Sequence, residues 1–410
     1  MKIIHINATD AGGGAAIAAF RHCEAMRKAG LDAEMLVLNH TKRGIPFIHS
    51  ILPNKKWAKI RTVLMYQIMN LLLKPFHPWG VFSFPVFSVS IANHSLLKEA
   101  DLIYIHWVAG SMLSTREIER ILKLGKPVRW YMHDMNPITG GCHYAMDCER
   151  YKIGCKDCPF LRSHPLGLDL ASKQYKLRMK HWSKYSNLEA YTPSAWLGHC
   201  VKESALWKGH KVTVFPNVFD LKKFRMFDSL MARELLGVKT ERKLILFGAV
   251  SVDSEYKGWK YMQEALNLLD SKHYEALVFG EENPRLKRDL NISCHFVGFL
   301  HDEYSLILAY NAADVFVSAS LADNYPNVVM EAMACGLPCV GFNIGGLADQ
   351  IQHKVTGYLA EPKNSASLAE GIKFVCESSE ESCRFMQQKA RAFVNEVASY
   401  EVYFDKTRQL

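Results

Sequence analysis

The chain of 410 residues is 49% hydrophobic and 22% charged, and its formal net charge at pH 7 is +9. This composition excludes a disordered chain, and the length exceeds what one ordinary hydrophobic core accommodates, so two folded domains are expected. No apolar run reaches the roughly 18 residues of a membrane-spanning helix, and the N-terminal MKIIHINATDAGGG lacks the apolar region of a signal peptide, so we expect a cytoplasmic protein.

The charge is unevenly distributed along the chain. Residues 1–214 contain 29 Lys and Arg against 15 Asp and Glu, whereas the remainder contains 21 against 26. No acidic residue occurs between Met35 and Lys98. A basic half favours anionic partners, namely a membrane surface, a lipid phosphate or a nucleic acid, although a solvated basic surface without a ligand explains the same charge.

Strands and helices alternate in the first half. KIIHIN is an apolar strand, DAGGGAAIAAFRHCEAMRKAG is a glycine-rich turn and an amphipathic helix, and AEMLVLN is the next strand. This β-α-β order predicts a parallel sheet. Further buried strands are expected at residues 101–107, 127–134, 189–194 and 211–220.

Segment 54–75, NKKWAKIRTVLMYQIMNLLLKP, combines basic side chains with an apolar face. It predicts a basic amphipathic helix that lies on an anionic bilayer. A surface helix that packs this face on its own domain is the alternative. The basic residues are Lys55, Lys56, Lys59 and Arg61, and the apolar residues are Trp57, Leu64, Met65, Ile68, Met69 and Leu72.

The alternation restarts in the second half, with strands expected at KLILFGAVS, YEALVFGEE, CHFVGFL and DVFVSAS and helices between them. Two successive α/β series predict two Rossmann-like domains that face each other across a cleft, with ligands beyond the carboxyl ends of the strands. We expect the first domain at residues 1–214 and the second at residues 215–394.

The stretch SLADNYPNVVMEAMACGLPCVGFNIGG, residues 320–346, places seven residues between Asp323 and Glu331, in a loop that opens a helix. Two carboxylates in one site suit a ligand with hydroxyls at two places, because each carboxylate accepts two hydroxyl hydrogen bonds. The alternative is helix capping, with Asp323 or Asn324 near the N-terminus and Glu331 in the first turn.

This stretch resembles the signature of the family-4 retaining glycosyltransferases, which have the GT-B fold, and in its DN-x-PN form it is similar to enzymes of bacterial surface-polysaccharide assembly. The resemblance implies that Glu331 contacts the ribose of a nucleotide diphosphate-sugar and Asp323 its sugar, with Asn324 beside them. Asp323 replaces the usual glutamate, and its shorter side chain would change those contacts. The resemblance also implies that residues 395–410 form a helix that crosses back to the first domain.

The resemblance extends to the start of the second series. LILFGAVSVDSEYKGW is similar to the family's strand and loop at the donor diphosphate, which implies contacts from Gly248 and Lys257. Many relatives carry an arginine where this chain has Ala249, and Arg129 or Arg162 would be the substitutes. An exposed loop lysine is the alternative for Lys257.

Two further segments are similar to the family's donor site. HFVGFL matches the segment that receives the nucleobase, which implies Gly298 and Leu300 there. GGLADQIQHKVTGYLAEP matches the tail of the donor site, which implies that Gly345 and Gly346 let the backbone approach the ligand.

In the first half, ATDAGGGAA is not an intact G-x-G-x-x-G, so a dinucleotide site is not expected. It resembles the family's glycine loop, which implies that Gly12, Gly13 and Gly14 approach the donor phosphates and the acceptor; a tight strand-to-helix turn explains two of the three equally well. His133 ends the strand WYMHD, and the resemblance implies that it faces the reacting sugar and hydrogen-bonds hydroxyls. A structural histidine is the alternative.

Four cysteines cluster within CHYAMDCERYKIGCKDC. Four thiols that end in C-x-x-C predict a closed structural zinc site, which would fix the loop after the histidine-bearing strand. Reduced thiols without a ligand and two disulfides are the alternatives. The predicted zinc ligands are Cys142, Cys148, Cys155 and Cys158.

With the resemblance, we expect a retaining hexosyltransferase of polysaccharide biosynthesis that requires no cofactor for catalysis. His133, Asp323 and Lys257 would be its catalytic residues. Its partners would be a nucleotide diphosphate-sugar, a saccharide or lipid-linked saccharide and an anionic membrane, but no nucleic acid. We therefore expect a cytoplasmic protein that can lie peripherally on the inner face of the cytoplasmic membrane. A GT-B sugar-nucleotide epimerase and a basic zinc-containing nucleic-acid-binding protein are the alternatives.

Overall fold

A computed structural model describes residues 1–52, 54–76, 81–85, 87–110, 112–161, 168–249, 255–280, 289–300 and 302–407. The chain divides into two compact units. The first comprises Met1–Val218 with the chain end from Thr407, and the second comprises Phe219–Lys406.

The first unit contains a seven-stranded sheet of order β3-β2-β1-β4-β5-β6-β7, in which all paired neighbours are parallel. Its strands are β1 (Lys2–Thr9), β2 (Asp32–Asn39), β3 (Ile48–Ser50), β4 (Leu102–Ile105), β5 (Val128–Tyr131), β6 (Leu188–Thr192) and β7 (Val212–Val214). Its helices include α1 (Gly14–Lys28), α2 (Lys55–Leu73), α3 (Ser95–Glu99), α4 (Thr115–Leu122), α5 (Leu170–Trp182) and α6 (Ala195–Glu203).

The second unit contains a six-stranded sheet of order β10-β9-β8-β11-β12-β13, again parallel throughout. Its strands are β8 (Lys243–Ala249), β9 (Tyr274–Gly280), β10 (Ser293–Gly298), β11 (Val315–Ser318), β12 (Cys339–Phe342) and β13 (Gly357–Ala360). Its helices include α7 (Ser229–Leu235), α8 (Trp259–Asn267), α10 (Glu303–Ala312), α11 (Asn327–Ala334), α12 (Leu347–Gln350), α13 (Ser365–Cys376), α14 (Glu380–Ala398) and α15 (Tyr400–Thr407).

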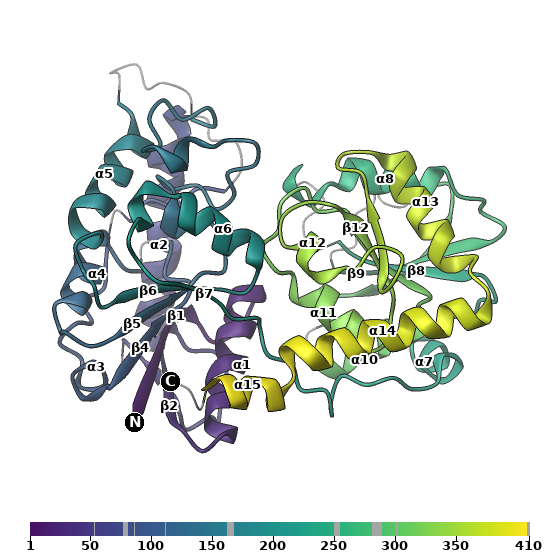
Figure 1. Cartoon of the computed structure of the whole chain (residues 1–410), viewed down its shortest axis with the longest axis horizontal. Coiled ribbons are helices and arrows are strands. Elements are labelled where there is room, and N and C mark those ends of the chain that lie inside the picture. Colours follow the sequence, from purple (N-terminus) through teal and green to yellow (C-terminus); the bar gives the residue numbers. More distant parts are fainter. Residues whose placement is uncertain are drawn as a thin grey trace. The chain divides into compact units, whose positions relative to one another are not determined.

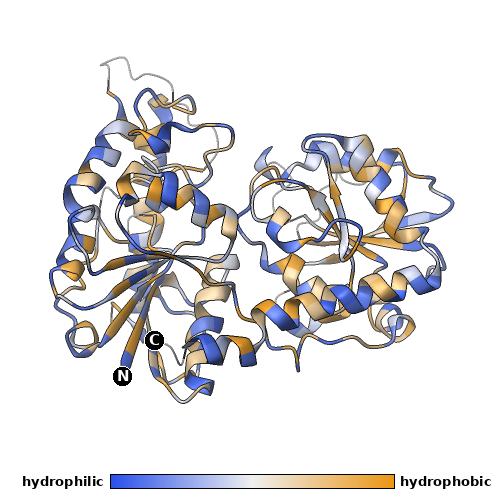
Figure 2. Ribbon diagram, viewed as in Figure 1, coloured by the Kyte–Doolittle hydropathy of each residue, from blue (hydrophilic) through white to orange (hydrophobic). Residues whose placement is uncertain are grey.

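Helices cover both faces of the second sheet, so its inner strands are buried on both sides and read as continuous apolar runs, whereas the edge strand β10 is partly exposed. Every residue of β9 is buried, and so is every residue of β12. Figure 1 shows α8 and α13 on one side of this sheet and α10 and α14 on the other. Figure 2 shows the hydrophobic strands inside each unit. The predicted α/β class with two parallel sheets is therefore confirmed.

Candidate active site

The loops at the carboxyl ends of β8 and β11 meet in the second unit. The Lys257 ammonium donates to Asp323 Oδ2 at 2.9 Å, and the backbone N–H of Leu321 donates to the carbonyl oxygen of Tyr256 at 2.7 Å. Gly258 has a φ of 67°, and a Cβ there would lie 1.9 Å from the carbonyl oxygen of Ala319. Only glycine permits both the left-handed backbone and this approach, so the two loops are locked together.

The glycine pair after β12, Gly345 and Gly346, contacts the backbone carbonyl group of Asp323. The backbone N–H of Gly346 donates to the carbonyl oxygen of Asp323 at 3.0 Å. Gly345 has a φ of 53°, and a Cβ there would lie 2.6 Å from that oxygen. The structure thus brings Lys257, Asp323 and the Gly-Gly turn into one arrangement.

The electrostatics of this pair keep the lysine charged. Burial lowers the pKa of Lys257, but the carboxylate of Asp323 outweighs burial, so the pKa lies above its usual value. The Lys257 side chain remains 41% exposed and that of Asp323 13% exposed. A half-exposed ammonium next to a carboxylate can bind a ligand that carries both an anionic group and hydroxyls.

Helix capping does not explain the two acids. Helix α11 begins at Asn327, its N-cap is Pro326 without a side-chain cap, and its first turn holds no acidic residue. Glu331 therefore lies beyond the first turn, contrary to expectation, and it is buried, where it accepts a hydrogen bond of 2.9 Å from the Tyr310 hydroxyl. Asn324 is also buried.

Local packing or backbone geometry accounts for the remaining residues of the second unit that were predicted to contact the donor. A Cβ on Gly248 would lie 2.7 Å from the Phe279 ring, so packing demands glycine there. Gly298 has a φ of 68° and lies at a register shift between β9 and β10. Leu300 packs against the apolar core of this unit.

Arg129 and Arg162 were predicted as substitutes for the arginine that many relatives carry at the position of Ala249. Arg129, on β5 of the first unit, donates to Glu189 at 3.4 Å and to the Tyr104 hydroxyl at 3.1 Å. Arg162 lies outside the described residues. The side chain of Ala249 is likewise outside the described part of the chain.

In the first unit, His133 lines a cavity at the carboxyl ends of β4 and β5, together with Trp107 and Asp134. Its Nε2 lies 3.1 Å from Nδ1 of His106. Burial lowers the pKa of His133 to about 4, although the neighbouring carboxylate of Asp134 acts in the opposite direction. His133 is therefore a neutral imidazole at physiological pH.

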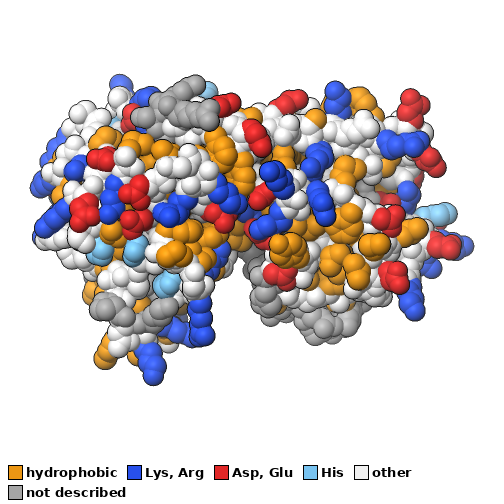
Figure 3. All heavy atoms as spheres, turned by 90° about the horizontal axis from the view of Figure 1, so that it is seen from below, with side chains coloured by type: hydrophobic (Ala, Val, Ile, Leu, Met, Phe, Trp, Pro, Cys, Tyr) orange, Lys and Arg blue, Asp and Glu red, His pale blue; other side chains and the backbone are white. Residues whose placement is uncertain are grey.

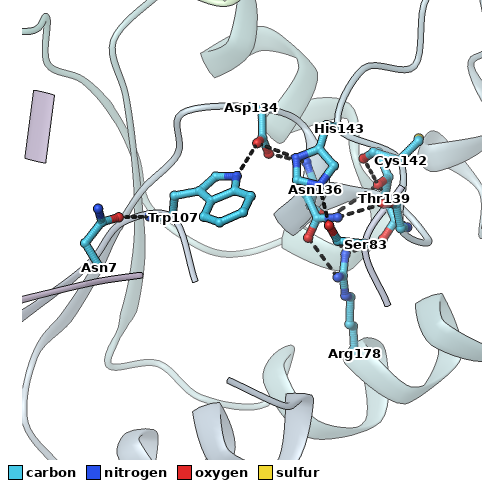
Figure 4. Close-up of polar contacts among 10 residues, drawn as sticks. Asn7, Ser83, Trp107, Asp134, Asn136, Thr139, Cys142, His143 and Arg178 are labelled. Carbon is cyan, nitrogen blue, oxygen red and sulfur yellow. Dashed lines mark hydrogen bonds and ion pairs between the residues drawn. The ribbon is translucent and has the colours of Figure 1, made fainter. Parts of the chain in front are cut away.

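A buried polar network fixes the loop that follows His133 (Figure 4). Asp134 Oδ2 accepts from the Trp107 indole at 3.0 Å and contacts His143 Nδ1 at 2.6 Å. His143 Nε2 in turn lies 2.8 Å from the hydroxyl of Ser83. Burial raises the pKa of Asp134, but His143 and a backbone N–H outweigh burial and lower it, so the carboxylate stays ionised.

The buried guanidinium of Arg178, on α5, holds the next part of the same loop (Figure 4). It donates to the carbonyl oxygens of Asn136 and Thr139 and, at 3.0 Å, to the Asn136 side chain. A loop whose carbonyl groups are satisfied in this way is rigid, so it gives the cavity a defined wall.

The glycine loop before α1 is exposed, and backbone geometry accounts for two of its three glycines. Gly12 and Gly13 have φ angles of 79° and 91°, whereas Gly14 is the first residue of the helix. A tight turn thus explains glycine at the first two positions. The reason is the left-handed backbone alone, because a Cβ at either position would have no heavy atom within 4 Å.

The predicted zinc site is not supported. Within the described ranges, no group of three or more His, Cys, Asp or Glu side chains is placed to hold a metal ion. Cys142 packs in an apolar cluster with Phe82 and Phe84, and Cys155 belongs to the main core of the first unit. All four cysteines are free, so the arrangement agrees with reduced thiols in apolar surroundings. They are Cys142, Cys148, Cys155 and Cys158.

Sequence reasoning missed the residues that surround His133. His5 lies on β1 and His106 directly follows the neighbouring strand β4, and both are buried. The available signal was weak: YIHW and YMHD each place a histidine two residues after a buried tyrosine, on the same face of a strand.

A family model described as "Glycosyl transferases group 1" matches residues 232–393. This range includes Lys257, Asp323, Glu331 and the Gly-Gly turn. The second unit carries a group 1 glycosyltransferase domain.

Curated relatives agree with this group 1 domain. The uncharacterized glycosyltransferase MJ1607 of Methanocaldococcus jannaschii is 29% identical over 207 residues, 47% of this chain and 52% of that protein. The putative colanic acid biosynthesis glycosyl transferase WcaC of Escherichia coli is 24% identical over 263 residues, 61% and 62% of the two chains. The E. coli UDP-Gal:alpha-D-GlcNAc-diphosphoundecaprenol alpha-1,3-galactosyltransferase is 29% identical over 176 residues, 40% and 44%. The chain spans about half the length of the curated relatives it matches.

Solved structures extend the similarity to both units. Anabaena HepE, in complex with UDP and glucose, has a TM-score of 0.64 at 17% identity. The superposition covers 100% of this chain and 98% of the HepE chain. WaaG, a glycosyltransferase involved in lipopolysaccharide biosynthesis, has a TM-score of 0.60 at 13% identity, with 98% and 99% covered. At this identity the likeness shows the fold, and the predicted GT-B fold is confirmed.

Proposed function

We propose that the chain transfers a sugar from a nucleotide diphosphate-sugar to a hydroxyl of a saccharide acceptor, with retention of the anomeric configuration. The observation that carries this proposal is the Lys257–Asp323 pair at 2.9 Å, held against the Gly-Gly turn inside the group 1 domain. The pair offers a cation for a diphosphate and a carboxylate for sugar hydroxyls in one place.

Each group would then have a defined task. Lys257 neutralises the charge that develops on the departing diphosphate, which is the main stabilisation that such a transfer needs. Asp323 orients the sugar, and the buried Glu331 with Tyr310 supports the ribose side. His133 would hydrogen-bond hydroxyls near the reacting carbon, so the chain would work chiefly by orientation and charge stabilisation, without a metal.

The relatives suggest the substrate classes. HepE is described in complex with UDP and glucose, and the E. coli galactosyltransferase is named for a diphosphoundecaprenol-linked acceptor. We therefore expect a UDP-sugar as donor and a lipid-linked saccharide as acceptor, in polysaccharide biosynthesis.

The donor site can be tested by comparing two lysines. Lys257→Ala removes a charge-assisted contact of about 1.5–3 kcal/mol, which should raise the Kd for the UDP-sugar by roughly tenfold to a hundredfold. Lys260→Ala, three residues later on an exposed part of α8, is the matched control and should leave the Kd unchanged. Calorimetric titration with UDP-, GDP- and ADP-sugars measures both. Equal affinities for the two variants would contradict the diphosphate role.

The reaction class needs a separate measurement. Release of free UDP only when acceptor is present indicates transfer, whereas conversion of the sugar without acceptor indicates the epimerase alternative. The anomeric proton coupling of the product, compared with that of the donor, shows retention or inversion. Steeply salt-dependent RNA or DNA binding without nucleotide-sugar affinity would favour the nucleic-acid alternative.

We further propose that α2 docks the chain on an anionic membrane, where a lipid-linked acceptor would lie. The predicted helix is present, with Met65 and Met69 buried against its own unit and Met69 in an apolar cluster. The opposite side is apolar and uncovered: Trp57 is 65% exposed and Leu71 70% exposed. At 100° per residue, Trp57, Ile60, Leu64 and Leu71 form one stripe.

Basic residues flank this exposed stripe. Lys56 and Lys59 lie along one side of it and Arg61 along the other, in a chain segment without any acidic residue. Figure 3 shows Lys and Arg side chains beside hydrophobic ones on the surface of the first unit. An apolar stripe between cations fits the interface of an anionic bilayer better than it fits another protein surface. No helix in the described ranges is long and apolar enough to cross a membrane.

Vesicle sedimentation tests this surface. Binding to vesicles that contain phosphatidylglycerol, and not to pure phosphatidylcholine, is expected. Each basic residue contributes about 1 kcal/mol, so Lys56→Gln with Lys59→Gln should weaken binding by roughly tenfold or more. The control, Lys202→Gln with Lys208→Gln, makes the same charge change elsewhere on the first unit. Equal losses in both pairs, or dimerisation through α2 without vesicle binding, would contradict the proposal.

A further inference from the structure

Two buried histidines and a partly buried one form a chain of hydrogen bonds across the centre of the first sheet. His5 lies on β1, His106 follows β4 and His133 follows β5, which are adjacent strands. His5 Nδ1 lies 2.9 Å from His106 Nε2, and His106 Nδ1 lies 3.1 Å from His133 Nε2. The rings are stacked, with centroids 5.2 and 5.3 Å apart. We refer to these three residues as the histidine relay.

All three rings are neutral near pH 7. Burial lowers the pKa of His5 to about 3 and that of His133 to about 4, and it holds the pKa of His106 well below its usual value. A neutral imidazole has one N–H donor and one nitrogen acceptor. Both hydrogen bonds of the relay must therefore run in the same direction, either towards His5 or towards His133.

Met26, on α1, decides this direction. Its Sδ lies 3.4 Å from His5 Nε2, and a thioether sulfur can accept a hydrogen bond but cannot donate one. His5 Nε2 therefore carries the proton, and His5 Nδ1 accepts from His106 Nε2. His106 Nδ1 then accepts from Nε2 of His133, which leaves Nδ1 of His133 with a lone pair.

We propose that Met26, His5 and His106 are positioning residues that hold His133 in its Nε2–H form, so that its Nδ1 accepts a hydrogen bond from a substrate hydroxyl. The proposal rests on the proposed function, in which His133 meets the reacting sugar. His133 lines the cavity beside Trp107, and its Nδ1 has no partner among the described residues.

This tautomer selects a class of ligand group. A nitrogen lone pair accepts from a hydroxyl, whereas a phosphate or carbonyl oxygen can itself only accept and is disfavoured there. The relay therefore fits the site for a sugar hydroxyl and not for the diphosphate, which agrees with a lysine for the diphosphate in the other unit. The opposite tautomer would require a lone pair on His5 to face the sulfur of Met26.

Nuclear magnetic resonance of the full chain, labelled with 15N-histidine, reads the tautomers directly from the ring nitrogen shifts and couplings. His133→Gln assigns the signals of that ring. We expect His133 to carry its proton on Nε2. Met26→Leu keeps the volume but removes the acceptor, so His5 and His133 should then populate both forms. Met112→Leu, at another buried methionine of the same unit, should leave the ring signals unchanged.

Two results would overturn the relay: a proton on Nδ1 of His133 in the unaltered chain, or unchanged tautomers in Met26→Leu. His106→Asn interrupts the relay and should also release the preference of His133. The spectra require no turnover. Absence of nucleotide-sugar binding would therefore refute the proposed function. The tautomer of His133, read from the spectra, would still test the relay independently.

Discussion

Acidification should destabilise the first unit, because folding keeps the buried His5 and His106 neutral. His5 is completely buried, and burial lowers its pKa to about 3 from 6.5. A folded-state pKa below the unfolded value means that the stability is complete above about pH 6.5 and is lost as the pH falls from there towards 3. At about pH 5 the unfolded chain binds a proton at His5 and the folded chain does not, which removes about 2 kcal/mol. Burial of His106 acts in the same direction.

Urea unfolding at several pH values measures this loss. Seven of the eight tryptophans lie within residues 1–218, so tryptophan fluorescence reports mainly on the first unit. His5→Gln cannot take up the proton, and its stability should fall by about 2 kcal/mol less than that of the unaltered chain between about pH 8 and pH 5. The exposed His199 provides a control, because His199→Gln should retain the full pH dependence. If His5→Gln and the unaltered chain show the same pH dependence, the assignment of a neutral buried His5 is wrong.

Three further changes test other parts of the structure. Gly258→Ala should destabilise the second unit by several kcal/mol, because its Cβ would lie 1.9 Å from the carbonyl oxygen of Ala319 and the backbone would also be strained. Gly209→Ala introduces the backbone strain alone and should lower the free energy of unfolding, measured by thermal unfolding, by about 1 kcal/mol. Tyr310→Phe leaves the buried Glu331 one donor short and should lower stability by about 1–3 kcal/mol; an unchanged melting temperature would contradict that contact. Incubation with a chelator should leave the melting temperature unchanged, whereas a clear drop would restore the zinc interpretation of the four clustered cysteines.

Helices and strands were predictable from the sequence where the hydrophobic pattern of a single segment determines its secondary structure. The buried apolar runs of β1 and β9 indicate parallel strands because helices cover both faces of each sheet. Helix α2 was predictable from its period, but the sequence did not decide which of its apolar residues face inwards. The structure separates them: Met65 and Met69 pack inside, while Trp57 and Leu64 stay outside.

The sites were predictable only as far as local spacing determines geometry. The Asp323 loop and the Gly-Gly turn meet because they follow adjacent parallel strands, β11 and β12. The capping alternative for Glu331 fails because α11 begins at Asn327, which leaves Glu331 beyond the first turn. The four cysteines end in C-x-x-C and line one apolar cavity, yet among the described residues no group of side chains is placed to hold a metal ion. The histidine relay joins His5 to His106, 101 positions away, and His106 to His133, 27 positions away, so the similar YIHW and YMHD segments alone do not reveal it.

The position of the histidine relay also bears on how this scaffold could be re-engineered. His5 stands on the central strand β1, whereas His106 and His133 come directly after β4 and β5 and line the cavity themselves. Loops from a related protein could thus be grafted only beyond His106 and His133, with these two residues and the three strands retained. Such chimaeras would show whether the tautomer of His133 depends on the loops around it or on the relay alone.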